Sequence, residues 1–317
     1  MRIYRHQEAV FPASPREYKE TEVSDSAFRI VGIQKPEEEV LQVKKKWYQG
    51  RPVLSWAILL LILLGCLFCD VIMTKDPTYM DLMNYNLAPN REFLLGTDTM
   101  GRDIFSMIWY GGRISLFIGL LSTVISTAIA VVFGGISGIA PQWLDTLLMR
   151  LTEILLSVPN LLLVILLQAI LGKPNVVTIS VVIGVTSWTS IAKIVRTEVR
   201  QIRNSEYVIA SRCMGGRFFH ILWRHLAPNF VSSIMFMVVM NVRIVIVSES
   251  TLSFMGIGLP LEIISWGSML SLSEKALLTG SWWIILIPGI FLVVTLLCMT
   301  AIGNDLRRQV NQKQSNL

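Results

Sequence analysis

The sequence predicts an all-α protein, a polytopic membrane bundle with six transmembrane helices. Hydrophobic residues make up 53% of the 317 residues and charged residues only 16%, and the mean hydropathy is +0.57. These values exceed what a water-facing surface allows. The apolar residues gather in six runs, each close to the roughly 20 residues that cross a bilayer as a helix. The alternation typical of β-barrel strands is absent, so the bundle is predicted to be helical.

Six apolar runs supply the predicted transmembrane helices. In hydrocarbon every backbone N–H and C=O must be satisfied internally, and a helix achieves this. The runs cover residues 53–73, 114–139, 154–171, 176–194, 230–247 and 282–302. The first run follows a long charged segment that contains prolines, so it does not have the position of a cleaved signal peptide, and we expect it to remain as an anchor. In the third run, Pro159 can kink the helix or leave backbone groups free for a neighbour.

The distribution of lysine and arginine predicts the orientation of the bundle. Of the 28 basic residues, 21 fall on one side of the predicted membrane, six fall on the other, and Arg243 lies inside the fifth run. The excess marks the cytoplasmic side, so both termini are predicted to be cytoplasmic. The resulting division is a cytoplasmic N-terminal segment (1–52), a first transmembrane helix (53–73), an extracytoplasmic loop (74–112), a five-helix core (113–305) that includes a cytoplasmic loop (195–228), and a cytoplasmic tail (306–317).

Charge and ligand-forming residues exclude several function classes. The net charge of +6 is spread over cytoplasmic loops without interleaved aromatic residues, so no nucleic-acid partner is expected, whereas Lys44, Lys45 and Lys46 would meet anionic lipid headgroups. Cys66 and Cys69 lie inside the first apolar run, where packing is a better interpretation than redox chemistry. We find no metal-ligand cluster and no nucleophile with a base, so neither a catalytic residue nor a cofactor bound by this chain is expected.

The predicted extracytoplasmic loop contains one dense polar motif. Its members are Gly96, Thr97, Asp98, Gly101, Arg102 and Asp103. A metal or anion site is one interpretation. The better one is structural: glycine turns and an Asp–Arg pair that hold a short surface helix. As an exposed ion pair it would contribute about 1 kcal/mol or less.

Small residues recur every four positions at both ends of the second apolar run. They are Gly111, Ser115 and Gly119 at one end and Gly134 and Gly138 at the other. Because lipid supplies no hydrophobic drive for helix association, such a face lets another helix approach closely. We predict that it contacts another transmembrane helix.

The cytoplasmic loop predicts a short docking helix. Asn204 or Ser205 can cap it, Glu206 lies in its first turn, and Gly215 ends it. One face carries the i, i+3, i+4 and i+7 positions Tyr207, Ala210, Ser211 and Met214. Small residues flanked by an aromatic and a flexible apolar side chain form a face that fits a groove. The loop is therefore predicted to dock another protein.

Two ionisable residues fall in or at the end of the fifth run. Arg243 and Glu249 are six positions apart, which does not favour a direct pair within the helix. Because such groups are costly in a membrane, each is expected to face another helix, a partner subunit or an aqueous pathway. A pathway role and a structural interhelical bond remain equal alternatives. Ser250 and its neighbouring hydroxyls either bond back to the helix or line a polar path.

These features resemble the inner permease subunits of binding-protein-dependent ATP-binding cassette importers. The stretch Glu206-Tyr-Val-Ile-Ala-Ser-Arg-Cys-Met-Gly215, followed after nine residues by His225-Leu-Ala-Pro-Asn229, is similar to their coupling motif. More narrowly, the chain resembles the second permease of dipeptide, oligopeptide and nickel importers over residues 94–305. The motifs that carry this are Leu95-Gly-Thr-Asp…Gly-Arg-Asp103, Tyr110-Gly-Gly-Arg-Ile-Ser-Leu116, Asp145…Met149-Arg150…Pro159 and Glu249-Ser-Thr-Leu-Ser-Phe-Met-Gly-Ile-Gly258 with Ser265-Trp-Gly267.

The resemblance implies a multi-pass permease of a bacterial-type inner membrane, half of a heterodimeric pore with a sister permease. Two cytoplasmic ATPase subunits would bind ATP and Mg²⁺, and an extracytoplasmic substrate-binding protein would deliver substrate. The coupling helix that contacts the ATPase would present Glu206, Tyr207, Ala210, Ser211, Arg212, Met214 and Gly215. Ile209 stands where the family usually has glutamate, and Glu206 is placed to substitute for it.

Short peptides are the expected substrates, and nickel or a metal chelate is the alternative. The sequence contains no Gly-x-x-x-x-Gly-Lys-Ser/Thr motif, so ATP is expected to bind elsewhere. A different class also remains open, an ATPase-independent secondary carrier or channel in which Arg243 and Glu249 form ion or proton sites. That class leaves the groove-shaped face of the docking helix unexplained.

Overall fold

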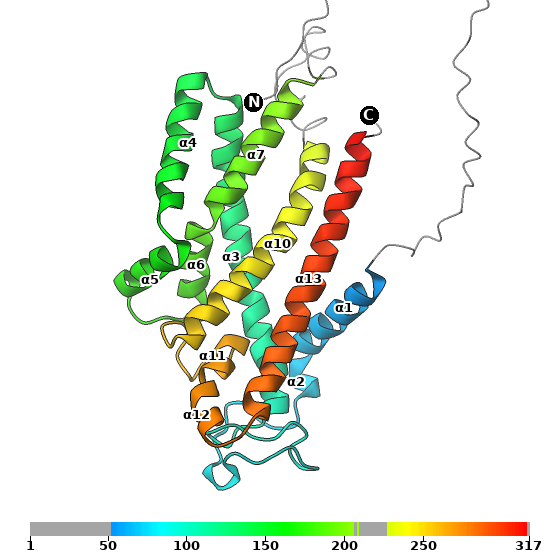
Figure 1. Cartoon of the computed structure of the whole chain (residues 1–317), viewed down its shortest axis with the longest axis vertical. Helices are drawn as coiled ribbons and strands as arrows, with labels where there is room; N and C mark the ends of the chain where they lie inside the picture. Colours follow the sequence, from blue (N-terminus) through cyan, green and yellow to red (C-terminus); the bar gives the residue numbers. More distant parts are fainter. Residues whose placement is uncertain (1–51, 206–207, 209–226, 316–317) are drawn as a thin grey trace, which may run out of the picture. The chain divides into compact units, whose positions relative to one another are not determined.

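The computed structural model describes residues 52–205, 208 and 227–315, which all belong to one compact unit, Trp47–Leu317. These residues form helices and connecting loops, and the only bridge between extended residues among them joins Thr97 to Asp103. The predicted all-α class is confirmed. In chain order (Figure 1) the elements are α1 (Val53–Leu67), α2 (Cys69–Ile72), the 3-10 turn η2 (Leu82–Asn84), α3 (Ile104–Ile139), α4 (Gln142–Ser157), α5 (Asn160–Leu171), α6 (Val176–Thr186), α7 (Trp188–Arg203), α10 (Ala227–Phe254), α11 (Trp266–Ser271), α12 (Ser273–Leu278) and α13 (Trp283–Ser315).

The long helix α3 starts earlier than its hydropathy predicts. It begins at Ile104, inside the segment 74–112 that the sequence assigns to the extracytoplasmic loop, so the end of this segment is helical; its side of the membrane stays a prediction. Asp103 is its N-cap: Oδ2 accepts hydrogen bonds from the backbone N–H of Ser106 at 3.1 Å and from its hydroxyl at 2.6 Å. Thr74 also donates to this oxygen, at 3.0 Å. A cap of this kind satisfies donors that the first turn leaves free.

The small-residue face of α3 contacts other helices, as predicted. A Cβ added to Gly119 would lie 2.9 Å from Ile246 of α10. Toward the other end of α3, Gly134 and Gly138 lie against Val195 and Val199 of α7, and a Cβ on Gly138 would lie 2.7 Å from Val199. The small residues therefore serve two neighbours, α10 at one end and α7 at the other.

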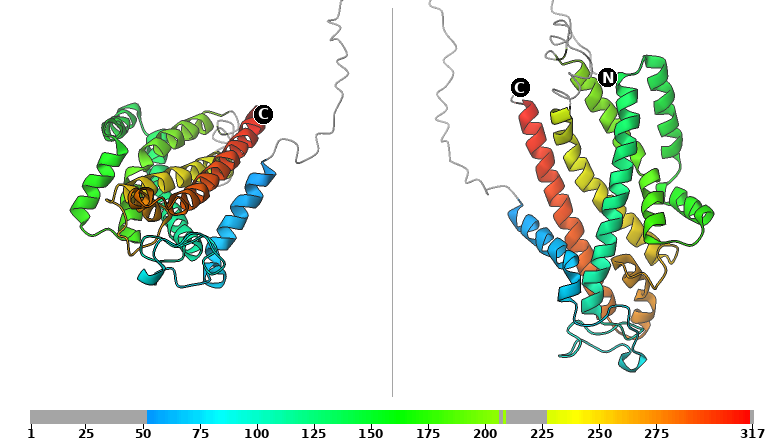
Figure 2. Two further views of the ribbon diagram at one scale, coloured as in Figure 1. Left: turned by 60° about the horizontal axis from the view of Figure 1, so that its bottom comes forward. Right: turned by 180° about the vertical axis from the view of Figure 1, so that it is seen from behind.

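On the other side of α3, α10 packs against α13, and α13 packs against α1. Figure 2 shows this order from behind, with α3 between the α10–α13 pair and α4. Leu59 of α1, Ile246 of α10 and Ile302 of α13 belong to one buried apolar cluster. A second cluster surrounds Trp266, which is fully buried and whose indole N–H donates to the carbonyl of Ile108 at 3.0 Å.

Three described helices are long and apolar enough to cross a membrane: α3, the Ile234–Phe254 part of α10 and the Trp283–Gln309 part of α13. Two further spans result if α4 with α5, and α6 with α7, each count as one bent span. The predicted run 53–73 is interrupted at Phe68, which separates α1 from α2. At 1.5 Å per residue, α1 is about 22 Å long and thus shorter than a hydrocarbon core of roughly 30 Å. The count of six spans and the side of each terminus stay predictions.

Candidate functional site

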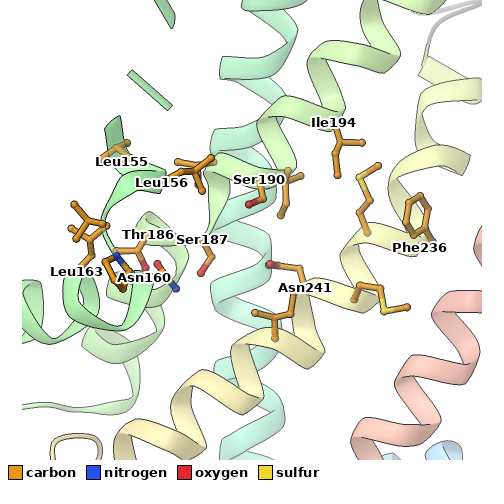
Figure 3. Close-up of a pocket in the computed structure, with 17 residues that line it drawn as sticks. Leu155, Leu156, Asn160, Leu163, Thr186, Ser187, Ser190, Ile194, Phe236 and Asn241 are labelled. Carbon is orange, nitrogen blue, oxygen red and sulfur yellow. The ribbon is translucent and has the colours of Figure 1, made fainter. Parts of the chain in front are cut away.

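A pocket of about 410 Å³ lies where the two bent helix pairs meet α10 (Figure 3). Residues at both bends line it, together with the ends of α4, α5, α6 and α7 that adjoin them. Its volume falls in the range of small-molecule sites, roughly 300 to 1,000 Å³. Because residues of both bends line it, the pocket lies beside the break in each helix pair.

Proline creates the first bend. α4 ends at Ser157, α5 begins at Asn160, and the two axes differ by 86°. Pro159 has no N–H to donate and its ring fixes φ, so the helix cannot continue through it. Its carbonyl then accepts from the N–H of Leu162 at 2.9 Å, which starts α5. The predicted kink at Pro159 is confirmed, but the single helix 154–171 is wrong.

The second bend lies at Ser187, where the axes of α6 and α7 differ by 45°. The preceding hydroxyl, Thr186 Oγ1, bonds back to the carbonyls of Val182 and Ile183 at 3.0 and 3.1 Å, a contact that often bends helices. Ser187 Oγ is covered and has no hydrogen-bond partner among the described residues. Irregular backbone at membrane depth is tolerated where protein buries it or where it lines a cavity, and here it lines the pocket.

Asn241 of α10 supplies an oriented amide to the pocket. Its Nδ2 donates to Thr123 Oγ1 at 3.1 Å and to Ser126 Oγ at 2.9 Å, both on α3. Ser126 donates its own proton to the Thr123 carbonyl, so its oxygen is the acceptor for the amide. This assigns the amide nitrogen to the α3 side. The Asn241 oxygen is turned toward the pocket in Figure 3.

The described residues that line the pocket are all uncharged. Polar groups come from both bends, from the first turn of α7 and from α10. Apolar side chains complete the wall, and they include Phe236, Met237 and Met240 on α10. Of the residues that the sequence singles out as polar pathway candidates, Arg243, Glu249 and Ser250, none lines this pocket.

Glu249 instead joins three helices. It is fully buried, and its Oε1 accepts from the hydroxyl of Ser253 at 2.9 Å and from that of Ser265, the N-cap of α11, at 2.8 Å. Its Oε2 lies 3.5 Å from the hydroxyls of Ser250 and of Ser115 on α3. The Ser115 hydroxyl in turn accepts from the N–H of Trp266 at 3.1 Å. The carboxyl group therefore connects α10, α3 and the start of α11.

Among the described residues, no hydrogen bond or ion pair joins Arg243 to Glu249. The Nε of Arg243 is covered and has no hydrogen-bond partner among the described residues. The spacing argument that separates the two residues agrees with this arrangement. The structure thus brings Glu249 and Ser250 together and leaves Arg243 outside their cluster.

The motif 96–103 forms a closed turn before α3, and its ion pair is buried. Arg102 Nε donates to Asp98 Oδ2 at 2.7 Å, and the two side chains are only 3% and 2% exposed, so the expectation of an exposed pair is wrong. Asp98 Oδ1 also accepts from the backbone N–H groups of Met100 and Arg102. Gly101 has a φ of +73°, which favours glycine. Among the described residues, no group of three or more His, Cys, Asp or Glu could hold a metal ion.

The rest of the motif attaches this turn to later parts of the chain. Thr97 is buried; its hydroxyl donates to the carbonyl of Asn84 at 2.5 Å, and its carbonyl accepts from the indole N–H of Trp283 at 3.1 Å. Gly96 has a φ of +80°, and a Cβ there would meet Trp283. Arg102 reaches the carbonyl of Leu261 at 3.3 Å. The sequence order gives no sign of these partners.

A buried carboxylate near the start of α4 forms a cluster that sequence reasoning missed. Asp145 is 3% exposed. Arg196 of α7 binds both of its oxygens, Nε to Oδ1 and Nη2 to Oδ2 at 2.6 Å. Arg200 Nη2 donates to Oδ2 at 2.8 Å, and the Ser137 hydroxyl of α3 donates to Oδ1 at 2.6 Å. The available signal was the pair of arginines at i and i+4, which share one face of a helix.

α7 leads directly into the predicted docking loop. Arg203, at its end, donates to the carbonyl of Ile139 in α3 at 3.1 Å, and Val208 beyond it is buried. The predicted coupling residues lie outside the described residues; they are Glu206, Tyr207, Ala210, Ser211, Arg212, Met214 and Gly215. Their contacts and the docking helix stay predictions.

Comparison with known proteins identifies the family. Residues 130–312 match the family described as binding-protein-dependent transport system inner membrane component, and the chain belongs to this family. It is 38% identical over 232 residues to the dipeptide transport system permease protein DppC of Bacillus subtilis, covering 73% of this chain and 72% of that protein. It is 37% identical over 256 residues to the oligopeptide transport system permease protein OppC of the same organism, covering 81% and 83%. The chain is thus a membrane component of a transport system and not an enzyme, and the resemblance seen in the sequence is confirmed.

Proposed function

We propose that this chain is the permease subunit of an ATP-driven importer of short peptides and forms half of a heterodimeric pore with a sister permease. The observation that carries the proposal is the uncharged pocket between two broken helices, in a chain of this family. Discontinuous helices in transporters place polar backbone and side-chain groups where substrate binds. The relatives named above are dipeptide and oligopeptide permeases, which supports peptides as the substrate.

Two cytoplasmic ATPase subunits would bind ATP and Mg²⁺ and drive transport, and an extracytoplasmic substrate-binding protein would deliver the peptide. The contacts of α7 support a path by which movement of the ATPase subunits would reach the helices of this chain. Asp145 ties α7 to α4, Arg203 ties it to the end of α3, and the predicted docking loop follows at once. A force on that loop would therefore act on α3, α4 and α7 together. Rocking of these helices would open the pore to one side and then to the other.

The test begins with purification of the tagged chain from its native membranes in mild detergent, followed by mass spectrometry. We expect two ATPases, a related permease and a secreted receptor. The assembled complex is then placed in liposomes and supplied with receptor, ATP and radiolabelled trialanine. Uptake should require ATP hydrolysis.

Two variants test the docking loop in the same assay. Gly215→Arg, and a bulky residue at Ala210, should abolish uptake while the chain remains inserted. Uptake without ATPase subunits would contradict the proposal and favour a carrier or channel. Uptake of nickel or a nickel chelate in place of trialanine would retain the importer and replace its substrate. Normal uptake by both variants would contradict the docking role of the loop.

A further inference from the structure

We propose that the pocket between the two helix bends is a binding station on the transport path that holds a peptide by its backbone and discriminates against charged side chains. This inference rests on the proposed function and deepens it. It assigns part of the substrate selection to this chain, in addition to whatever the delivering protein selects. Its basis is the chemistry of the pocket wall.

The polar groups of the pocket match a peptide backbone. Every peptide unit other than one at proline offers one N–H donor and one C=O acceptor, whatever its side chain. The Asn241 oxygen is held toward the pocket by the two bonds of its Nδ2 to α3, so it is oriented to accept a peptide N–H. Across the pocket, Asn160 at the first bend and Ser190 in the first turn of α7 are exposed and line the wall. They provide donors for a peptide carbonyl.

The remaining wall suits apolar side chains of varied shape. Phe236, Met237 and Met240 line the pocket from α10, and Ile194 lines it from α7. Methionine is unbranched and adapts to different partners, which is why it is common at surfaces that accept many ligands. Backbone recognition together with an adaptable apolar wall predicts tolerance of peptide sequence.

The wall of the pocket offers no partner for a charged peptide side chain. All the described lining residues are neutral, so a charged side chain would lose water without gaining a charged partner, and this cost adds to that of the two charged termini, which all three peptides tested below share. A peptide with a charged central side chain should therefore pass more slowly than a neutral one of similar size. The discrimination should depend on this wall and should change when a charge is placed in it.

The experiment places a charge at Ser190, which is exposed in the pocket wall. The assembled transporter in liposomes is supplied with Ala-Ala-Ala, Ala-Lys-Ala and Ala-Glu-Ala in separate radiolabelled assays. Ser190→Asp should raise the ratio of lysine-peptide to glutamate-peptide uptake by about fivefold, the effect of one partly exposed ion pair, and Ser190→Lys should lower it by a similar factor. The matched control is Thr146→Asp, which adds the same charge on the exposed surface at the other end of α4. It should leave the ratio unchanged.

A second measurement uses the unmodified chain. A tripeptide with a central benzophenone side chain is cross-linked to the transporter during ATP-driven uptake, and the labelled residues are mapped by mass spectrometry. Labelling of Met237 or Met240 is expected. Cross-linking only outside the pocket, or equal uptake ratios in both Ser190 variants while trialanine is still transported, would overturn the binding station. Failure of the unmodified complex to transport any peptide would instead reject the proposed function.

Discussion

Asp145 and Arg196 form a two-point ion pair that connects the start of α4 to the middle of α7, with Arg196 Nη2 2.6 Å from Asp145 Oδ2. Such paired contacts fix direction as well as distance, because two parallel bonds resist rotation. Arg200 adds a third bond to the same carboxylate. The pair therefore holds α4 and α7 in a fixed relation to each other.

The first prediction concerns this pair. Asp145→Ala leaves two arginines and the Ser137 hydroxyl without their common acceptor, so it should lower the free energy of unfolding by about 3 kcal/mol. Peptide uptake should fall further than stability explains, because α4 and α7 no longer move as a unit. Thermal unfolding and uptake by the purified complex measure the two effects.

The matched control for this pair is Arg150→Ala. Its partner is Glu153, and their side chains are 73% and 49% exposed, so the change should cost about 0.5 kcal/mol or less. A double-mutant cycle of Asp145→Ala with Arg196→Ala should show strong coupling. Additive effects in that cycle, with uptake intact in both single variants, would refute the transmitting role.

The second prediction concerns Glu249. Glu249→Gln keeps the shape of the side chain and one acceptor oxygen for the hydroxyls of Ser253 and Ser265, so ATP-driven uptake should be largely retained. Glu249→Leu removes the carboxylate acceptor and leaves the buried protons of these hydroxyls without their partner, at a cost of about 2 kcal/mol in unfolding free energy. Uptake by the Gln variant shows whether Glu249 connects the three helices structurally or serves as an ion or proton site. Complete loss of transport in a well-folded Glu249→Gln complex would revive the carrier interpretation.

The third prediction concerns two adjacent glycines of α3. A Cβ at Gly134 would collide with the Ala192 carbonyl and would lie 2.9 Å from Val195, whereas a Cβ at Gly135 would meet nothing within 4 Å. Gly134→Ala should destabilise the protein by about 2 kcal/mol through overpacking. Gly135→Ala should leave stability unchanged or raise it by up to about 1 kcal/mol, since alanine favours the helix. Thermal unfolding of both variants is the check; equal melting temperatures would show that α3 and α7 are not in close contact there.

The helical class and the close faces of α3 could be predicted because they depend on local composition and on a fixed period. The bends are harder to predict. Hydropathy averages over a window and contains no direction, so the run 154–171 continues through Pro159 although the chain turns there by 86°. Ser187 gives a weaker signal still, since serine is tolerated within helices. The start of α3 at Ile104 was missed because Gly111, Gly112 and Arg113 interrupt the apolar residues before Ile114, although the helix continues through them.

Partners distant in sequence account for most of the site that was missed. Asp145 and Arg196 are separated by 51 positions, and no periodic pattern within one helix links them. The orientation of Asn241 could not be predicted for the same reason, because it depends on Thr123 and Ser126 of another helix, more than 100 positions away. The burial of Asp98 with Arg102 likewise requires the later segment around Leu261, which contacts the arginine. Spacing identifies residues that share a face, but only the fold identifies what that face meets.

The bend at Ser187 sets how far each residue of α7 would move if this helix rotated about it. A helix of 16 residues is about 24 Å long at 1.5 Å per residue, so a rotation of about 5° at the bend would displace its far end by roughly 2 Å. Ser190 and Ile194, which line the pocket, lie on the same helix within two turns of the bend. A shift of about 2 Å at Arg203 thus corresponds to movement of well under 1 Å at Ser190, since displacement scales with distance from the bend. The ratio of the displacement at Arg203 to that at Ser190 depends only on their distances from the bend. Lengthening or shortening α7 by a turn beyond Ile194 would change this ratio without altering any contact in the pocket.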